Sequence, residues 1–126
     1  MAEKRFVILR HECPYGYKQG VHWDLMLEES RVLRTWALSA EPVVGQTISA
    51  EQLADHRLAY LDYEGPISGD RGVVSRWDCG SYELLDSVAG ELCFLMHGNR
   101  LSGRAVLTSD SSHSESWTFH VAPAVS

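Results

Sequence analysis

Residues 21–28 read VHWDLMLE, and this run carries the clearest structural signal of the chain. Every second residue, starting with the valine, is apolar, whereas the residues between them are histidine, aspartate, methionine and glutamate. Because successive side chains of a strand point to opposite faces, this alternation predicts a β-strand with one apolar face. A turn at residues 29–30 leads into residues 32–38, VLRTWAL, so we expect an antiparallel hairpin.

Short strand-like runs recur along the rest of the chain, separated by turns that contain Gly, Asp and Ser. This pattern predicts an all-β protein, either a barrel or a sandwich. The spacing Ser49-x-x-Gln52 fits a capping box and predicts one short helical turn at residues 49–54. The polar residues 109–116 predict a hairpin loop. The other predicted strands are residues 5–10, 57–63, 72–77, 81–85, 91–96, 104–108 and 117–121.

The length and composition predict one ordinary globular domain spanning residues 1–126, with 44% hydrophobic and 22% charged residues. No apolar run approaches the roughly 18 residues of a membrane span, and the N-terminus has no signal-peptide core, so we expect a cytoplasmic protein without a membrane partner. Cys13, Cys79 and Cys93 form no Cys-x-x-Cys pair, which favours reduced thiols. The net charge of −6 argues against non-specific coating of nucleic acid but leaves a local phosphate site open.

His22 and Asp24 are the first candidate site residues. Two positions apart in a strand, they project from the same face, roughly 6–7 Å apart. An imidazole and a carboxylate at this separation can converge on one divalent ion if another segment adds a third ligand. His11 is the natural candidate, because a loop of about ten residues can return the chain beside it. The alternative is that the pair only occupies a solvated strand face, as short His-x-Asp motifs often do.

His56 and Tyr60 are the second candidate pair. A histidine at the entrance to a strand could donate a proton to a leaving oxygen or bind a phosphate oxygen, and a tyrosine hydroxyl could add a hydrogen bond. The alternative is a surface histidine and a tyrosine at the edge of the core. The remaining histidines, His97, His113 and His120, have no partner at strand spacing and are expected to be structural or exposed.

Several blocks of sequence, taken in order, are similar to one known family. They run through residues 5–121 as RFVILRH, HWDLMLE, LRTWA, DHRLAY and YEG, followed by WDxGxY, GELxFxxHG and LxGR. This order resembles the 3′-phosphoesterase domain of bacterial DNA ligase D, as a divergent, stand-alone member. The resemblance implies a small closed or partly closed antiparallel β-barrel.

The resemblance also implies a function and a set of site residues. It implies an enzyme that depends on Mn²⁺, or on another divalent transition metal, and removes a terminal ribonucleoside and then the 3′-phosphate from nucleic-acid 3′ ends. His11, His22 and Asp24 would be the metal ligands. His56 and Tyr60 would contact the scissile phosphate. The implied partners are nucleic-acid 3′ ends and ligase or polymerase repair proteins, and we expect a monomer.

The chain departs from the family pattern at several of these positions. Arg34 stands where the family usually has a lysine, which keeps the charge but not the geometry. Met26 replaces an arginine on the face of the expected ligands, which removes a phosphate clamp worth on the order of a hundredfold in rate. The family places an arm with basic and acidic residues ahead of the first strand, whereas this sequence starts only a few residues before it. The loop after His11 is longer, Ala54 replaces an acidic residue and Arg57 replaces a proline.

Three interpretations follow from these departures and from the motif itself, and in the first of them the enzyme is retained. Arg57, Arg71 or Arg76 could compensate for the lost arginine. Otherwise the chain would be a catalytically weakened module that binds DNA ends or a repair partner. A third alternative is a non-haem iron oxygenase that uses His22, Asp24 and the distant His97, although the chain is short for that double-sheet fold.

Overall fold

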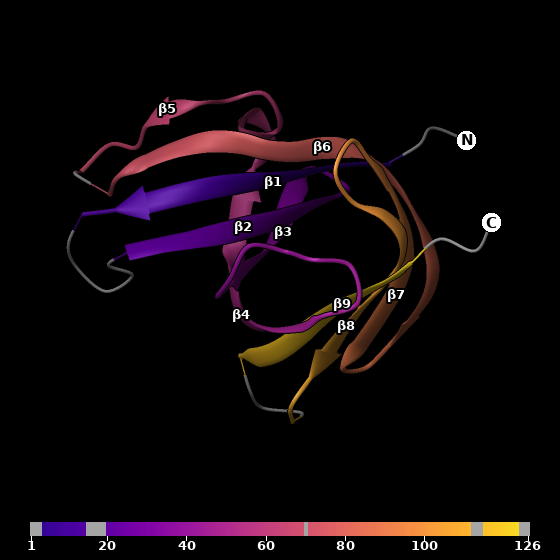
Figure 1. Cartoon of the computed structure of the whole chain (residues 1–126). Helices are drawn as coiled ribbons and strands as arrows, with labels where there is room; N and C mark the ends of the chain where they lie inside the picture. The colour runs from indigo at the N-terminus through magenta and orange to yellow at the C-terminus, as the bar shows by residue number, and fades with distance from the viewer. Residues whose placement is uncertain (1–3, 15–19, 70, 112–114, 124–126) are drawn as a thin grey trace.

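The computed structural model describes residues 4–14, 20–69, 71–111 and 115–123, which form nine β-strands and one short 3₁₀ helix (Figure 1). The elements are β1 (Lys4–Cys13), β2 (Gly20–Glu29), β3 (Val32–Leu38), β4 (Thr47–Arg57), η1 (Leu58–Leu61), β5 (Gly65–Pro66), β6 (Val73–Val88), β7 (Glu91–Gly98), β8 (Ser102–Ser109) and β9 (Ser116–Pro123).

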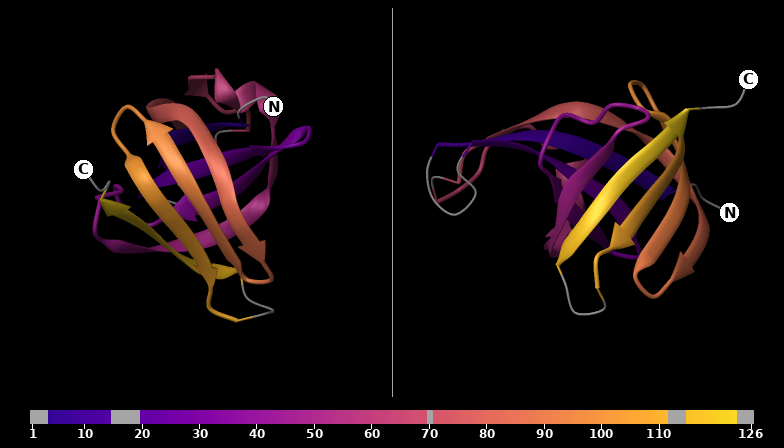
Figure 2. Two further views of the ribbon diagram at one scale, coloured as in Figure 1. Left: turned by 90° about the vertical axis from the view of Figure 1, so that its right-hand side faces the viewer. Right: turned by 60° about the horizontal axis from the view of Figure 1, so that its bottom comes forward.

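Eight of the strands close into a ring in which every neighbouring pair is antiparallel. Their order is β1-β2-β3-β4-β9-β8-β7-β6, and β6 pairs back with β1. The long strand β6 makes this closure, because its first part runs beside β1 and its last part bends to pair with β7 (Figures 1 and 2). The short strand β5 adds to the free edge of β6. The prediction of an antiparallel all-β fold with a closed sheet is confirmed.

The interior of the ring holds the main hydrophobic core. Alternate residues of each strand point inward, as strand geometry requires. Trp36 is completely buried, and its ring meets that of Trp117 edge to face at a centroid distance of 5.6 Å. Other large members of this core include Phe6, Ile8, Leu25, Leu27, Leu38, Tyr82, Phe94, Met96, Leu107 and Phe119.

A second hydrophobic cluster lies on the outer face of β1, β2 and β3. Val7, Leu9, Met26, Leu33, Leu61 and Val74 form it. Leu61 belongs to η1, and the partly buried Tyr60 and Ile67 pack against the cluster, so the segment around η1 and β5 covers this part of the sheet. The outer face of β2 is therefore buried rather than solvated.

The predicted helical turn at residues 49–54 is wrong, because these residues belong to β4. Ser49 pairs with Thr118 of β9, and Gln52 pairs with Trp36 of β3. Two partner strands satisfy the backbone of β4 at once, and this long-range pairing outweighs the weak local preference of a capping box. The one helical turn of the described chain comes later, at Leu58–Leu61 of η1, where a strand was expected over residues 57–63.

Two further expectations need correction. The predicted strands at residues 72–77 and 81–85 are one continuous strand, β6. Gly80 lies within it, and a Cβ at this position would come 2.0 Å from the carbonyl oxygen of His97, so this glycine permits a close approach of β7. The predicted loop at residues 109–116 is partly strand at both ends, and residues 112–114, including His113, lie outside the described residues.

The cysteines and the possible membrane spans are two further features for which the sequence makes a prediction. Cys13, Cys79 and Cys93 are free thiols, as the spacing predicts. Within the described ranges, no helix has the length and apolar character needed to cross a membrane.

Candidate metal centre

Three side chains of types that can bind a metal meet on the outer face of the β1–β2 ribbon, near the end of β1. His11 lies opposite His22 in the antiparallel register, and Cys13 lies two residues beyond His11. Residues paired across two strands point to the same side, as do residues two apart in one strand. The two imidazole rings consequently meet edge to face with centroids 4.6 Å apart.

Asp24 orients both imidazole rings. Its side chain is buried, and each carboxylate oxygen contacts one ring: Oδ1 lies 2.8 Å from Nδ1 of His22, and Oδ2 lies 3.1 Å from Nδ1 of His11. A ring whose Nδ1 faces a carboxylate presents its Nε2 on the opposite side. Asp24 therefore directs the Nε2 atoms of both histidines away from itself, toward Cys13.

The sulfur of Cys13 completes a group of three donors. Its Sγ lies 3.3 Å from Nε2 of His11 and 3.7 Å from Nε2 of His22. The three donor atoms all lie within 4.8 Å of one another. The described residues thus contain two imidazole nitrogens and one sulfur at a spacing that one divalent transition metal can bridge.

The backbone carbonyl of Arg71 points at the same place. Its oxygen lies 2.7 Å from Nε2 of His11 and 3.5 Å from Sγ of Cys13. Gly72 lets this segment approach β1, because it has a φ of +97° and a Cβ there would come 1.9 Å from the carbonyl oxygen of Glu12. The loop and the strand are therefore in direct backbone contact beside the donors.

The charges in this group explain the pKa shifts. Burial lowers the pKa of His11, but the hydrogen bonds to Asp24 and to the Arg71 carbonyl outweigh burial and raise the pKa above its ordinary value. Burial raises the pKa of Asp24, but the bonds from His11 and His22 outweigh burial and hold the pKa below its ordinary value. Burial, helped by the charge of Asp24, raises the pKa of Cys13. Without a cation the arrangement thus favours an imidazolium–carboxylate pair beside a neutral thiol.

We expect Gly72→Ala to lower the free energy of unfolding by about 2–4 kcal/mol, because the new Cβ adds a backbone clash to an unfavourable φ. Gly45→Ala is the matched control, since Gly45 has a φ of +91° and no atom within 4 Å of the position that a Cβ would take. In this control, the free energy of unfolding should fall by only about 1–2 kcal/mol. Urea unfolding of both variants measures the difference, and equal losses would contradict the close approach of Gly72 to Glu12.

His56 and Tyr60 lie on the outer face but away from the three donors. His56 pairs with Leu33 of β3, which in turn pairs with Glu28 of β2. His56 is therefore two strands from β2 and level with a residue four positions from Asp24, about 13 Å along the strand. Its Nδ1 lies 2.9 Å from the Ala54 carbonyl oxygen, and its ring contacts that of Tyr60 at a centroid distance of 5.6 Å.

Tyr60 borders a separate cavity of about 240 Å³ between η1 and β5, which Arg57 also lines. Tyr60 also contacts Tyr63, with ring centroids 5.7 Å apart. The structure thus brings His56 and Tyr60 together with each other, but not into direct contact with the donor group. Their role as phosphate contacts stays a prediction.

Arg34 lies on the opposite face of the sheet from the donors. It pairs with Leu27, whose side chain belongs to the interior core. Its guanidinium lies 5.1 Å from the ring centroid of Trp36 and makes a 3.4 Å ion pair with Glu29. The structure does not bring Arg34 to the donor group, and its role in phosphate binding stays a prediction.

His97, the remaining candidate metal ligand, does not belong to the donor group. Nε2 of His97 on β7 lies 3.2 Å from a carboxylate oxygen of Glu83 on β6, and both side chains are exposed. The group of donors that could hold a metal, among the residues described, consists of His11, Cys13 and His22. The two-histidine, one-carboxylate arrangement expected of an oxygenase with His97 therefore has no support in the geometry.

Cys13 is the site residue that sequence reasoning missed. The sequence contains a pattern that points to it, because Cys13 lies two residues after His11, just as Asp24 lies two residues after His22. The predicted first strand ended at residue 10, whereas β1 continues through Cys13. A longer strand would have placed the thiol on the face of His11.

Met26 occupies the place of the expected arginine and is 1% exposed within the second hydrophobic cluster. We expect Met26→Arg to lower the free energy of unfolding by about 3 kcal/mol or more, because the guanidinium would enter an apolar site. Met26→Leu, which nearly conserves the volume, should cost less than about 1.5 kcal/mol. Denaturant unfolding of both variants checks this, and an Arg variant as stable as the Leu variant would contradict the burial.

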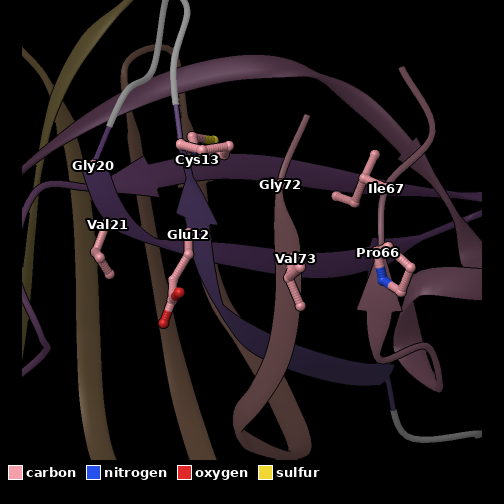
Figure 3. A pocket seen from close by; sticks show the side chains of 9 residues that line it. Glu12, Cys13, Gly20, Val21, Pro66, Ile67, Gly72 and Val73 are labelled. Carbon is pink, nitrogen blue, oxygen red and sulfur yellow. The ribbon is translucent and has the colours of Figure 1, made fainter. Parts of the chain in front are cut away.

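A cavity of about 510 Å³ adjoins the donor group at the ends of β1, β2 and β6 (Figure 3). Glu12, Val21 and Val73 extend to the same side of the strand ends, as their mutual pairing requires. Cys13 and Ile67 also line the cavity. The cavity is therefore mostly apolar, has one carboxylate and is bordered by one residue of the donor group.

The fold and the site together define a class: a small closed antiparallel β-sheet protein with a candidate transition-metal centre on the outer face of one hairpin. The chain belongs to the DNA Ligase D 3′-phosphoesterase domain family, which it matches over residues 12–109. The matched region contains Cys13, His22, Asp24, His56 and Tyr60 and begins directly after His11.

Two relatives illustrate the similarity. The multifunctional non-homologous end joining protein LigD of Pseudomonas aeruginosa is 32% identical over 110 residues, which cover 79% of this chain and 12% of that protein. The protein of the same name from Mycobacterium bovis is 33% identical over 126 residues, covering 91% of this chain and 15% of that protein. The chain thus corresponds to a small part of the length of these relatives.

Proposed function

We propose that this chain is a metal-dependent 3′-phosphoesterase that removes 3′-phosphates and 3′-terminal ribonucleosides from DNA ends during end repair. Membership of the family supports a hydrolase that acts in DNA end repair. The observation that carries the proposal is the convergence of two imidazole Nε2 atoms that Asp24 orients from behind. Such a pair is a ready binding site for a divalent transition metal.

The donor set fits such an ion. When bound, a divalent metal would neutralise charge on the phosphoryl group and lower the pKa of a bound water. His11 and His22 would hold it. Asp24 would keep both rings in the correct orientation, or would itself be a ligand as the family resemblance implies. In the proposed reaction, the metal is Mn²⁺ or another divalent transition metal.

The substrate would be the 3′ end of a nucleic-acid strand. The cavity of about 510 Å³ next to Cys13 has apolar walls that suit the terminal nucleoside. His56 and Tyr60 lie further along the outer face, and Arg57 lines the cavity beside Tyr60; all three would contact phosphates of the same nucleic-acid strand. Arg34, on the other face of the sheet, would be a further phosphate contact. Ligase and polymerase repair proteins are the proposed partners, and we propose that the chain acts as a monomer.

The experiment uses a primer–template with a 3′-phosphate, or with one 3′-terminal ribonucleotide, and a label at the 5′ end of the primer. The chain is incubated with Mn²⁺, with Zn²⁺ or with a chelator, and the primers are resolved on a denaturing gel. We expect a product with a 3′-hydroxyl only when metal is present, while a primer with only a 5′-phosphate stays unchanged. If neither Mn²⁺ nor Zn²⁺ supports formation of this product, the proposal is refuted.

A second candidate function is a binding module that has lost turnover. The apolar Met26 favours it, because this buried side chain occupies the position of a phosphate-binding arginine in the resemblance. This module would bind 3′-phosphorylated ends more tightly than 3′-hydroxyl ends at low salt and leave both unchanged. Fluorescence anisotropy with the two primers distinguishes it from the enzyme.

A further inference from the structure

We propose that Cys13, rather than Asp24, is the third protein ligand of the metal, and that the site therefore selects Zn²⁺ over Mn²⁺. This inference extends the proposed function, since it concerns the metal of the same site. It rests on the distances among four side chains and on the chemistry of their donor atoms.

The distances fit a tetrahedral ion. A Zn–S bond of about 2.3 Å and a Zn–N bond of about 2.0 Å at a tetrahedral angle put the sulfur and the nitrogen about 3.5 Å apart. Sγ of Cys13 lies 3.3 Å and 3.7 Å from the two imidazole Nε2 atoms. The cysteine is thus already at ligand spacing from both histidines.

Asp24 is arranged as a partner of the histidines rather than as a third ligand. One of its oxygens faces Nδ1 of His11 and the other faces Nδ1 of His22, at 3.1 Å and 2.8 Å. Those nitrogens are on the far side of each ring from the thiol. Histidines that bind a metal usually donate their other N–H to such a carboxylate, which fixes the ring and makes it a better ligand. One carboxylate serves both rings here.

The donor set decides the metal. A thiolate with two imidazoles suits zinc and related ions, whereas Mn²⁺ prefers carboxylate, carbonyl and water oxygens. On binding, the S–H of Cys13 and the Nε2–H of His11 each lose a proton to solvent, and two metal–ligand bonds form in their place. The Arg71 carbonyl oxygen lies 2.7 Å from Nε2 of His11 and 3.5 Å from the sulfur, so it borders the same group of donors.

The test uses Co²⁺ in place of Zn²⁺, because Co²⁺ absorbs visible light. The full chain is titrated with Co²⁺ and its absorption spectrum is recorded. A thiolate ligand adds a charge-transfer absorption in the near ultraviolet. We expect one equivalent of Co²⁺ to produce this absorption in the wild type and in Cys79→Ser, the matched control with another free and partly buried thiol. In Cys13→Ser the absorption should disappear.

Asp24→Asn separates the two ligand assignments. If Asp24 only orients the histidines, this variant should keep the charge-transfer absorption and bind Co²⁺ about 10–100-fold more weakly. Competition with a metal indicator should show that Cys13→Ser weakens Zn²⁺ binding by about a hundredfold or more and Mn²⁺ binding far less. Equal losses for the two metals would overturn the inference.

X-ray absorption of the zinc-loaded wild type gives a result that needs no variant. We expect one sulfur at about 2.3 Å from the metal. A shell of only nitrogen and oxygen, or no charge-transfer absorption in the wild type, would overturn the inference. These readouts are independent of turnover, so a chain with the thiolate signal but no phosphoesterase product would refute the proposed function and leave the ligand assignment standing.

Discussion

Replacing His22 with alanine is expected to reduce the metal-dependent release of 3′-phosphate by at least about a hundredfold. His22 is almost fully buried, and its Nε2 is one of the three converging donors. Without it, two donors from β1 would remain and Asp24 would lose one of its two ring partners. The measurement is the initial rate of the primer assay at saturating metal, together with the dissociation constant for the metal.

The matched control is His97→Ala, because His97 is exposed and pairs only with Glu83 among its described contacts. It should keep the wild-type rate and metal affinity. Circular dichroism of both variants confirms that the sheet is intact. If His22→Ala retained the full rate with an unchanged metal affinity, the metal centre would not be where the reaction takes place.

Asp78→Ala is expected to lower the free energy of unfolding by about 3–5 kcal/mol. Asp78 is 3% exposed and lies on β6. Its carboxylate oxygens accept hydrogen bonds from four backbone N–H groups, with N–O distances of 2.8–3.1 Å. The donors are Cys79, Asn99, Arg100 and Leu101. Alanine would leave the N–H groups of the β7–β8 turn without this acceptor.

Asp86→Ala is the control, because Asp86 also lies on β6 but is exposed. It should change the free energy by no more than about 0.5 kcal/mol. Asp78→Asn should fall between the two, since its amide keeps one acceptor oxygen but turns an NH₂ toward one of the N–H groups. Guanidinium unfolding without added metal measures all three. A loss for Asp78→Ala no larger than for Asp86→Ala would contradict the role of the carboxylate in holding the turn.

Sequence patterns predicted the parts of the structure that depend on neighbours along the chain. The β2–β3 hairpin is as expected, since the strand alternation and the turn are local features. The proximity of His11 to the His22–Asp24 pair is also local in origin, because β1 and β2 are consecutive strands that pair in antiparallel register.

Other features required information from distant strands. Residues 49–54 form a strand because β3 and β9 both pair with them, and no local pattern contains those partners. Met26 lies on the polar-looking face of β2, but Leu61 of η1 packs in the cluster that buries it. The separation of His56 from the donors likewise depends on the register of β3 and β4.

The alternation of apolar and polar residues in β2 is a local property of the chain, and it places His22 and Asp24 on the same face of the strand. What those side chains contact depends on the tertiary structure: the closure of β6 against β1 brings the Arg71 carbonyl to the donors, and Cys13 joins them because β1 extends to meet that segment. The physical reason is that side-chain direction repeats every two residues along a strand, whereas burial and donor geometry depend on which distant backbone packs against it.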